Sequence, residues 1–194
     1  ELRETYSRLN KYSVALTKQE LRRADFPGVF LKLSEELANL EYLETAKIFS
    51  VANRRRLADV EYVSEILAAL IAGPQDKRDS LDSFYLQYST WDMNECKEIE
   101  KRFLDVISDI SLIFSEKWGL AETRFRQKAD FYTLVLAIDD LRRAGGSLEN
   151  TDITDLRDDL HFLDYHIAPE SDIPDFRDYA IKCVSQANTI SSRR

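Results

Sequence analysis

"DVEYVSEILAALIAGP", residues 59–74, carries the clearest structural signal in the chain. Its apolar residues recur at spacings of three and four, which is the period of an α-helix. Asp59 gives the helix an acidic start, and Gly73-Pro74 ends it, because glycine readily closes a helix in the left-handed conformation and proline cannot continue one. The apolar stripe consists of Val60, Val63, Leu67, Leu70 and Ile71.

Similar patterns fill the rest of the chain. Thr17-Lys-Gln-Glu20 fits a capping box, in which the side chains of Thr17 and Glu20 each bond the other residue's backbone N–H. Pro27 suits the first turn of the following helix. The longest predicted helix runs from Asp92 to about Ser115. Further helices are predicted near 30–40, 81–88, 128–144, 153–167 and 174–187.

The amino-acid composition agrees with the prediction of a helical fold. The chain has only 5 Gly and 4 Pro in 194 residues, whereas β proteins use both residues in frequent turns. Loops of about two to eight residues favour antiparallel neighbours in a bundle. The sequence therefore predicts an all-α fold, an irregular helical bundle of about eight to ten helices with essentially no β-sheet.

The formal net charge of −8 is unevenly distributed. Between Asp139 and Asp178 twelve acids face four arginines, a difference of −8, so the other residues balance at 23 acids and 23 bases. An acidic C-terminal third repels phosphate backbones. Any contact with nucleic acid is therefore expected from the first two thirds of the chain, or from parts beyond it.

The sequence shows no signal peptide and no apolar run of about 18 residues, so no membrane partner is expected. Cys96 and Cys183 are far apart, and we expect two reduced thiols in a cytoplasmic protein. With His161 and His166 as the only histidines, no metal site is expected. No catalytic motif is found, and the adjacent acids Asp139 and Asp140 are interpreted as a solvated helix face rather than as an acid/base pair.

Two basic clusters are candidate anion or nucleic-acid contacts. Arg54, Arg55 and Arg56 lie just before a predicted helix start, where the helix dipole prefers acids. They either pair with Asp59 and Glu61 or bind a phosphate of a nucleotide, of nucleic acid or of a partner.

The second cluster lies between two predicted helices. Arg124, Arg126 and Lys128 are either a solvated linker or an anion contact. Tyr85 and Trp91, with Tyr88 between them, are expected to pack one helix against the next, with a stacking surface for a base or peptide as the alternative.

The stretch "YSRLNKYSVALTKQELRRADFPGVF", residues 6–30, resembles a conserved run of a bacterial family. That family is built on a ParB/sulfiredoxin-like domain and includes the nucleotide-dependent half of GmrSD-type modification-dependent restriction systems. The likeness extends into "RRRLADVEYVSEILAALIAG", "LDSFYLQYS" and "KADFYTLVLAIDDL", which look like the helical region after that domain.

The resemblance implies NTP binding or hydrolysis, with Mg²⁺, coupled to recognition and cutting of foreign DNA. The family's Asp-Gly-Gln-Gln-Arg signature would lie upstream and does not occur in this chain, nor does the His-containing nuclease domain of many members. The resemblance therefore places no cofactor in this part of the protein. The residues that match the family motif, and that are candidates for a junction or nucleotide pocket, are Arg8, Asn10, Gln19, Glu20 and Arg22.

From the resemblance we expect residues 1–26 to form the junction with an N-terminal ParB-like domain that is missing from this chain. Residues 27–194 form the helical domain, with a subdivision near 117–127. The expected function is a helical scaffold or interaction module of a phage-defence protein, non-catalytic by itself, that packs against the upstream domain and a nuclease domain or subunit. The alternatives are a DNA-contacting region of a modification-dependent nuclease and a free-standing helical adaptor.

Overall fold

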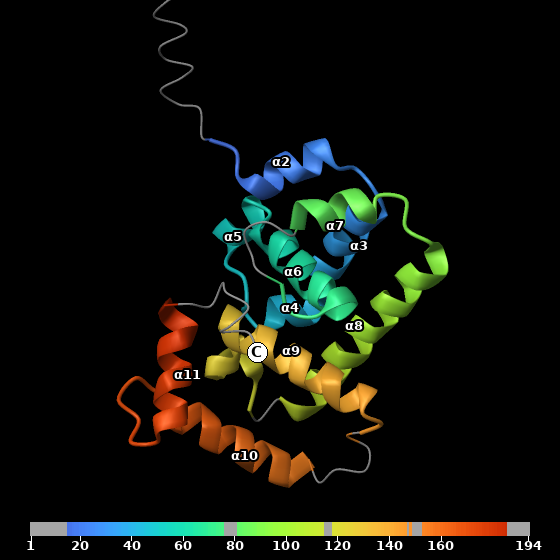
Figure 1. Ribbon diagram of the computed structural model, residues 1–194. Coiled ribbons are helices and arrows are strands. Elements are labelled where there is room, and N and C mark those ends of the chain that lie inside the picture. Colours follow the sequence, from blue (N-terminus) through green and yellow to red (C-terminus); the bar gives the residue numbers. More distant parts are fainter. Residues whose placement is uncertain (1–14, 76–80, 115–117, 147, 149–152, 186–194) are drawn as a thin grey trace, which may run out of the picture.

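The computed structural model describes residues 15–75, 81–114, 118–146, 148 and 153–185. Within these ranges the chain forms ten α-helices, two short 3-10 helices and no β-strand, which confirms the predicted all-α bundle (Figure 1). The elements are α2 (Lys18–Asp25), α3 (Val29–Ala38), α4 (Glu41–Thr45), α5 (Val51–Arg55), α6 (Ala58–Ala72), α7 (Leu81–Gln87), α8 (Met93–Ile113), η1 (Leu120–Glu122), η2 (Arg124–Arg126), α9 (Lys128–Arg143), α10 (Ile153–His166) and α11 (Pro174–Ser185).

Helix α6 is the centre of the bundle. Of its 15 residues, 11 are buried, and it contacts α2, α3, α5, α7, α8 and α9 (Figure 1). The burial goes beyond the predicted stripe, because Ile66 and Ala68 on other faces are also buried. The helix begins at Ala58, one residue before the predicted start, and ends at Ala72 with Gly73 in the predicted left-handed conformation (φ 81°). Enclosure of α6 therefore positions these six helices.

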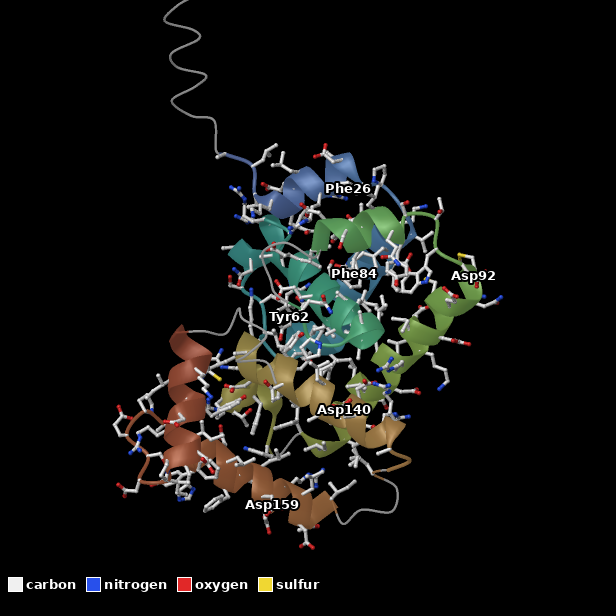
Figure 2. The ribbon with its side chains drawn as sticks, in the orientation of Figure 1. Phe26, Tyr62, Phe84, Asp92, Asp140 and Asp159 are labelled. Carbon is white, nitrogen blue, oxygen red and sulfur yellow. The ribbon has the colours of Figure 1, made fainter. Side chains whose placement is uncertain are left out.

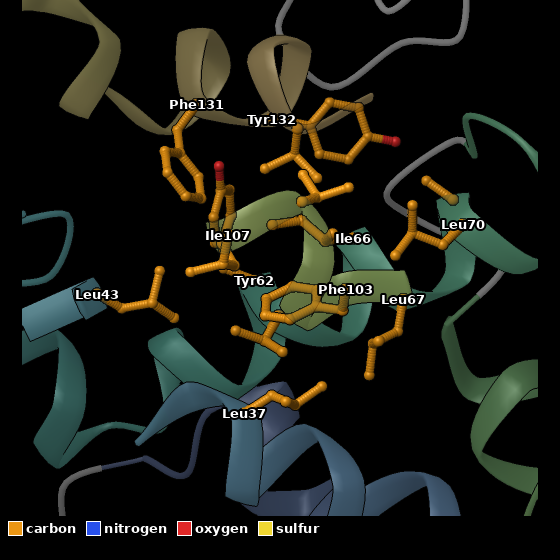
Figure 3. Close-up of a cluster of buried hydrophobic side chains, with 14 of the residues drawn as sticks. Leu37, Leu43, Tyr62, Ile66, Leu67, Leu70, Phe103, Ile107, Phe131 and Tyr132 are labelled. Atoms are coloured by element: carbon orange, nitrogen blue, oxygen red, sulfur yellow. The ribbon is translucent and has the colours of Figure 1, made fainter. Parts of the chain in front are cut away.

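One apolar core joins α3, α6, α8 and α9, and Leu67, Phe103 and Phe131 all belong to it (Figure 3). Leu120 of η1 and Phe125 of η2 belong to the same cluster. The core therefore includes residues of the segment 118–127, and the subdivision expected near 117–127 stays a prediction. The predicted long helix is confirmed as α8, which Asp92 caps by accepting from the backbone N–H groups of its first turn.

An aromatic cluster packs α7 and the loop after it against α3. The ring of Phe30 lies 5.1 Å from that of Tyr85 and 6.1 Å from that of Trp91, measured between centroids. Tyr88 and Trp91 are 4.7 Å apart, and Phe84 lies in the same cluster (Figure 2). The predicted packing role of these tyrosines and this tryptophan is confirmed.

Three helices differ from the expectation. The helices α4 and α5 were not predicted, because five residues are too few to show a helical period. Pro27 does not open α3, which begins at Val29 after Gly28. The first N–H groups of α3 instead reach across to the loop after α7, where Val29 N–H donates to the Ser89 carbonyl (3.0 Å).

This close approach of two backbones predicts the effect of a side chain at Gly28. A Cβ atom there would lie 2.6 Å from Ser89 Cα and 2.7 Å from its carbonyl oxygen, and backbone cannot yield as a side chain does. We expect Gly28→Ala to lower the free energy of unfolding by about 1–3 kcal/mol, measured by urea unfolding. Gly119→Ala is the matched control, because Gly119 has φ −74° and open space around it. Equal stability of the two variants would contradict the packing of α3 on this loop.

Candidate functional site

The family-like motif residues fasten α2 to the bundle. The predicted capping box is present, with Glu20 N–H donating to Thr17 Oγ1 (3.1 Å) and Thr17 N–H donating to Glu20 Oε2 (2.6 Å). The backbone hydrogen bond from Thr17 is the main cause that lowers the pKa of Glu20, and the charge of Arg56 adds to it. Arg56 Nη2 lies 3.0 Å from Glu20 Oε2, so this carboxylate both caps α2 and joins it to the end of α5.

Gln19 joins α2 to α7 and α6 through a relay of buried hydrogen bonds. Its side-chain Nε2 donates to the Tyr85 hydroxyl at 2.6 Å. That hydroxyl lies 2.6 Å from Ser64 Oγ, and Ser64 donates to the Val60 carbonyl at 2.7 Å. Because Ser64 uses its proton on Val60, Tyr85 must donate to Ser64. Every group in the relay is therefore satisfied, although Gln19 and Tyr85 are each only 1% exposed.

Arg22 makes the second fastening. Its Nε donates to Asp82 Oδ1 of α7 (2.5 Å) and its Nη1 to Glu61 Oε1 of α6 (2.9 Å). The Arg22 side chain is 6% exposed, whereas those of Asp82 and Glu61 are 63% and 29% exposed, so a buried cation meets two carboxylates that remain partly hydrated. Such a cation is tolerated only while its partners stay in place.

The buried residues of α2 are thus polar, which reverses the usual pattern of a surface helix. Gln19 and Arg22 point into the bundle, while Leu16 and Leu21 are 64% and 46% exposed. The structure brings Gln19, Glu20 and Arg22 together on one seam with α5, α6 and α7. Arg8 and Asn10, the other two motif candidates, lie outside the described residues.

A small hollow lies beside this seam. It has a volume of about 190 Å³ and is lined by Leu21, Arg22 and Phe26 among others. Small-molecule pockets usually enclose roughly 300–1,000 Å³. The hollow is therefore too small to hold a nucleotide by itself, and the assignment of Gln19, Glu20 and Arg22 to a nucleotide pocket stays a prediction.

Arg54, Arg55 and Arg56 lie just before the start of α6 at Ala58, as predicted, but they also end a short helix that was not predicted. The cluster is at the C-terminal end of α5, where the helix dipole favours cations, as well as ahead of α6. Arg56 pairs with Glu20, while the expected partner Glu61 is used by Arg22. Within the described part of the chain, Arg54 and Arg55 have no ion-pair partner, and Arg54 Nη2 is buried without a hydrogen bond.

The second basic cluster is divided by the fold. Arg124 is not a solvated linker residue, because its guanidinium forms two hydrogen bonds of 3.2 Å to the carboxylate of Asp130. The two side chains are 12% and 1% exposed. Lys128 Nζ lies 5.3 Å from the ring centroid of Phe49 and so makes a cation–π contact. Arg126 alone of the three is exposed.

The interpretation of Asp139 as part of a solvated helix face is also wrong. It is 2% exposed, and both of its oxygens accept from Arg102 of α8, whose Nη1 also donates to the Leu70 carbonyl at 2.7 Å. The signal was present in the sequence, because Asp139 follows Val135 by four residues and Phe131 by eight and so lies on the buried face of α9. Asp140, one residue on, is exposed as expected (Figure 2).

A larger cavity of about 560 Å³ lies between α8 and the end of α9. Its charged side chains are already paired, since Arg142 Nη1 donates to Asp109 Oδ2 at 2.5 Å and Arg142 Nη2 lies 3.2 Å from Asp105. Among the described residues, no three Cys, His, Asp or Glu side chains gather as a metal site would require. The same residues contain no helix that is long and apolar enough to cross a bilayer.

Comparison of the chain with known protein families, with characterised proteins and with solved structures finds no significant match.

The relay from Gln19 predicts a stability difference between two neighbouring tyrosines. Tyr85→Phe leaves the buried Gln19 amide without its acceptor, and we expect the free energy of unfolding to fall by about 1–3 kcal/mol. Within the described residues the Tyr88 hydroxyl makes no hydrogen bond, so Tyr88→Phe should change stability by less than about 0.5 kcal/mol. Urea unfolding followed by circular dichroism measures both variants. Similar losses in the two would argue against the relay.

Proposed function

We propose that this chain is the helical scaffold module of a phage-defence protein of the ParB/sulfiredoxin-like kind, and that α2 couples it to an upstream nucleotide-binding domain. The family resemblance of residues 6–30 supports the proposal. In it, NTP and Mg²⁺ belong to the upstream domain, and a nuclease domain or subunit is the further partner. The role of this chain is to bind and orient those parts.

The observation that carries the proposal is the polar attachment of α2. The side chains of the motif residues Gln19, Glu20 and Arg22 bond to α5, α6 and α7. These hydrogen bonds and ion pairs resist a displacement of α2. Polar attachments are directional, whereas apolar ones let helices slide. A helix held in this way is suited to pass the position of an upstream domain to the bundle.

The outward side of α2 is the surface that we assign to the upstream domain. Leu16 and Leu21 are exposed there, next to residues 1–14, through which the chain would continue into that domain. Apolar side chains left exposed beside a domain junction are typical of an interface that a second domain covers.

This assignment predicts an association that can be measured. The separately expressed upstream domain should bind the 194-residue chain, and Leu16→Glu with Leu21→Glu should weaken the binding at least about tenfold, because two charges would enter an apolar contact. Isothermal titration calorimetry measures the affinity. The matched control is Leu112→Glu in α8, a leucine that is 52% exposed and distant from α2. Absence of any association between the two parts would overturn the proposed function.

One observation favours the second candidate, contact with DNA. Within the described residues Arg54 and Arg55 lack acidic partners, and a guanidinium without a carboxylate is available to a phosphate. In this alternative α5 supplies DNA contacts for a modification-dependent nuclease. The acidic α10 and α11 would take no part in them.

The DNA alternative predicts a change in salt dependence. Arg54→Ala with Arg55→Ala should weaken DNA binding and reduce the slope of log K against log salt by about 2, since each phosphate contact contributes about 0.9. Fluorescence anisotropy with a labelled duplex at several salt concentrations gives the slope. Arg177→Ala with Lys182→Ala removes the same charge from α11 and should leave the slope unchanged. Parent-like binding by the α5 variant would exclude this role for Arg54 and Arg55.

A further inference from the structure

The hairpin of α10 and α11 buries much less apolar surface than the long helices α6, α8 and α9. Among the described side chains, the buried residue of α10 is Leu160 and that of α11 is Ala180. Leu156 and Leu163 pack only partly against the core. Apolar burial is the main term that holds helices together. This hairpin, which lies at the opposite end of the molecule from α2 (Figure 1), is therefore held by little apolar burial.

Polar contacts hold the start of the hairpin. Arg157 of α10 donates from Nε to the Ile113 carbonyl (2.7 Å) and from Nη2 to the Leu112 carbonyl (2.6 Å). These carbonyls belong to the C-terminal end of α8, where a helix leaves carbonyl groups without partners of its own. The contact gives these α8 carbonyls hydrogen-bond donors and also holds the first half of α10 against the body.

The second attachment centres on Arg124. Its backbone N–H donates to Asp164 Oδ1 of α10 at 2.7 Å, and its guanidinium donates to the Ile167 carbonyl just after α10. The same guanidinium lies 5.7 Å from the ring centroid of Tyr179 in α11. Arg124 thus contacts both helices of the hairpin from the body of the protein, while Asp130 of α9 fixes its orientation.

The two helices also contact each other. The rings of Phe162 in α10 and Phe176 in α11 pack edge to face with centroids 6.0 Å apart. This contact lies within the hairpin and not between the hairpin and the body, so it survives when the hairpin leaves. Separation breaks the contacts of Arg157 and Arg124, and also the stacking of His161 on Trp118 (centroids 3.7 Å apart) and the contact of Cys183 with Asp130.

We propose that the α10–α11 hairpin opens from the bundle as one unit and that the contacts of Arg124 and Arg157 keep it closed. Opening takes Leu160 out of the apolar core but leaves the residues of α3, α6, α8 and α9 in contact. It uncovers the largely buried Arg124 beside the exposed Arg126 and removes the acids of α10. The surface at the start of α9 therefore becomes accessible, with Arg126 and the pair of Arg124 and Asp130 exposed on it.

Two cysteines distinguish this opening from global unfolding. Cys183 lies on α11 with Sγ 3.6 Å from Asp130 Oδ1, and burial raises the pKa of its thiol, so its reactive thiolate is rare in the closed state. Cys96 is 5% exposed in α8 and becomes accessible only when the core is lost. Cys183 therefore reports on the hairpin and Cys96 on the whole bundle.

The test is the rate of modification of each cysteine by N-ethylmaleimide, followed by peptide mass spectrometry in urea concentrations below the unfolding transition. The Cys183 rate should rise with urea much less steeply than the Cys96 rate, because opening of a hairpin exposes less surface than unfolding does. Asp164→Ala should raise the Cys183 rate by roughly tenfold, the effect of losing one hydrogen bond, and leave the Cys96 rate unchanged. Asp159→Ala is the matched control, since Asp159 is exposed on the same helix and points away from the body (Figure 2).

Arg157→Met tests whether the hairpin moves as one unit. Arg157 lies near the start of α10, far along the chain from Cys183, so the variant should raise the Cys183 rate only if α10 and α11 leave together. No effect of Arg157→Met would mean that α11 frays alone, and it would overturn the proposal. Equal urea slopes for the two cysteines, or a Cys183 rate that ignores both urea and Asp164→Ala, would overturn it as well. Arg157→Met also decides the question if Asp164→Ala does not fold.

Discussion

Helix α6 is enclosed on nearly all sides, so polar atoms that it carries bond to neighbouring helices instead of to water. Ser64 receives its hydrogen bond from Tyr85 of α7, and Glu61 receives Arg22 of α2. At the other end of α6, the Leu70 carbonyl accepts from Arg102 of α8. Apolar packing brings the helices together, and these few polar atoms decide how each neighbour is rotated and how far it is shifted along α6.

The helices were largely predictable because their signals are local. The capping box at Thr17, the cap at Asp92 and the left-handed Gly73 each lie within a few residues of the helix end that they determine. The short helix α5 is too short to show a helical period and was not predicted. The favourable position of Arg54–Arg56 at its C-terminal end was therefore overlooked. Local rules were therefore enough to predict the fold class. Missing one short helix, however, changed the interpretation of how the helix dipole acts on a candidate site.

The partners of the charged residues could not be predicted in the same way. Arg22 and Glu61 are 39 residues apart in the sequence, so no helical spacing indicates that they pair. Which acid pairs with which arginine is decided only when the helices pack. The burial of Asp139 was easier to predict than its partner. Its spacing of four residues from Val135 places it on the apolar face of α9. The sequence thus shows which charges are enclosed more readily than it shows which charges meet.

The reversed polarity of α2 has a consequence for the order of folding. The hydroxyl that accepts from Gln19 and the carboxylates that meet Arg22 are in place only after α6 and α7 have packed together. With little apolar surface of its own to bury, α2 has nothing to gain from joining a partly formed bundle. Its attachment therefore belongs to the last step of assembly, after the folding transition state, and it slows unfolding without speeding folding.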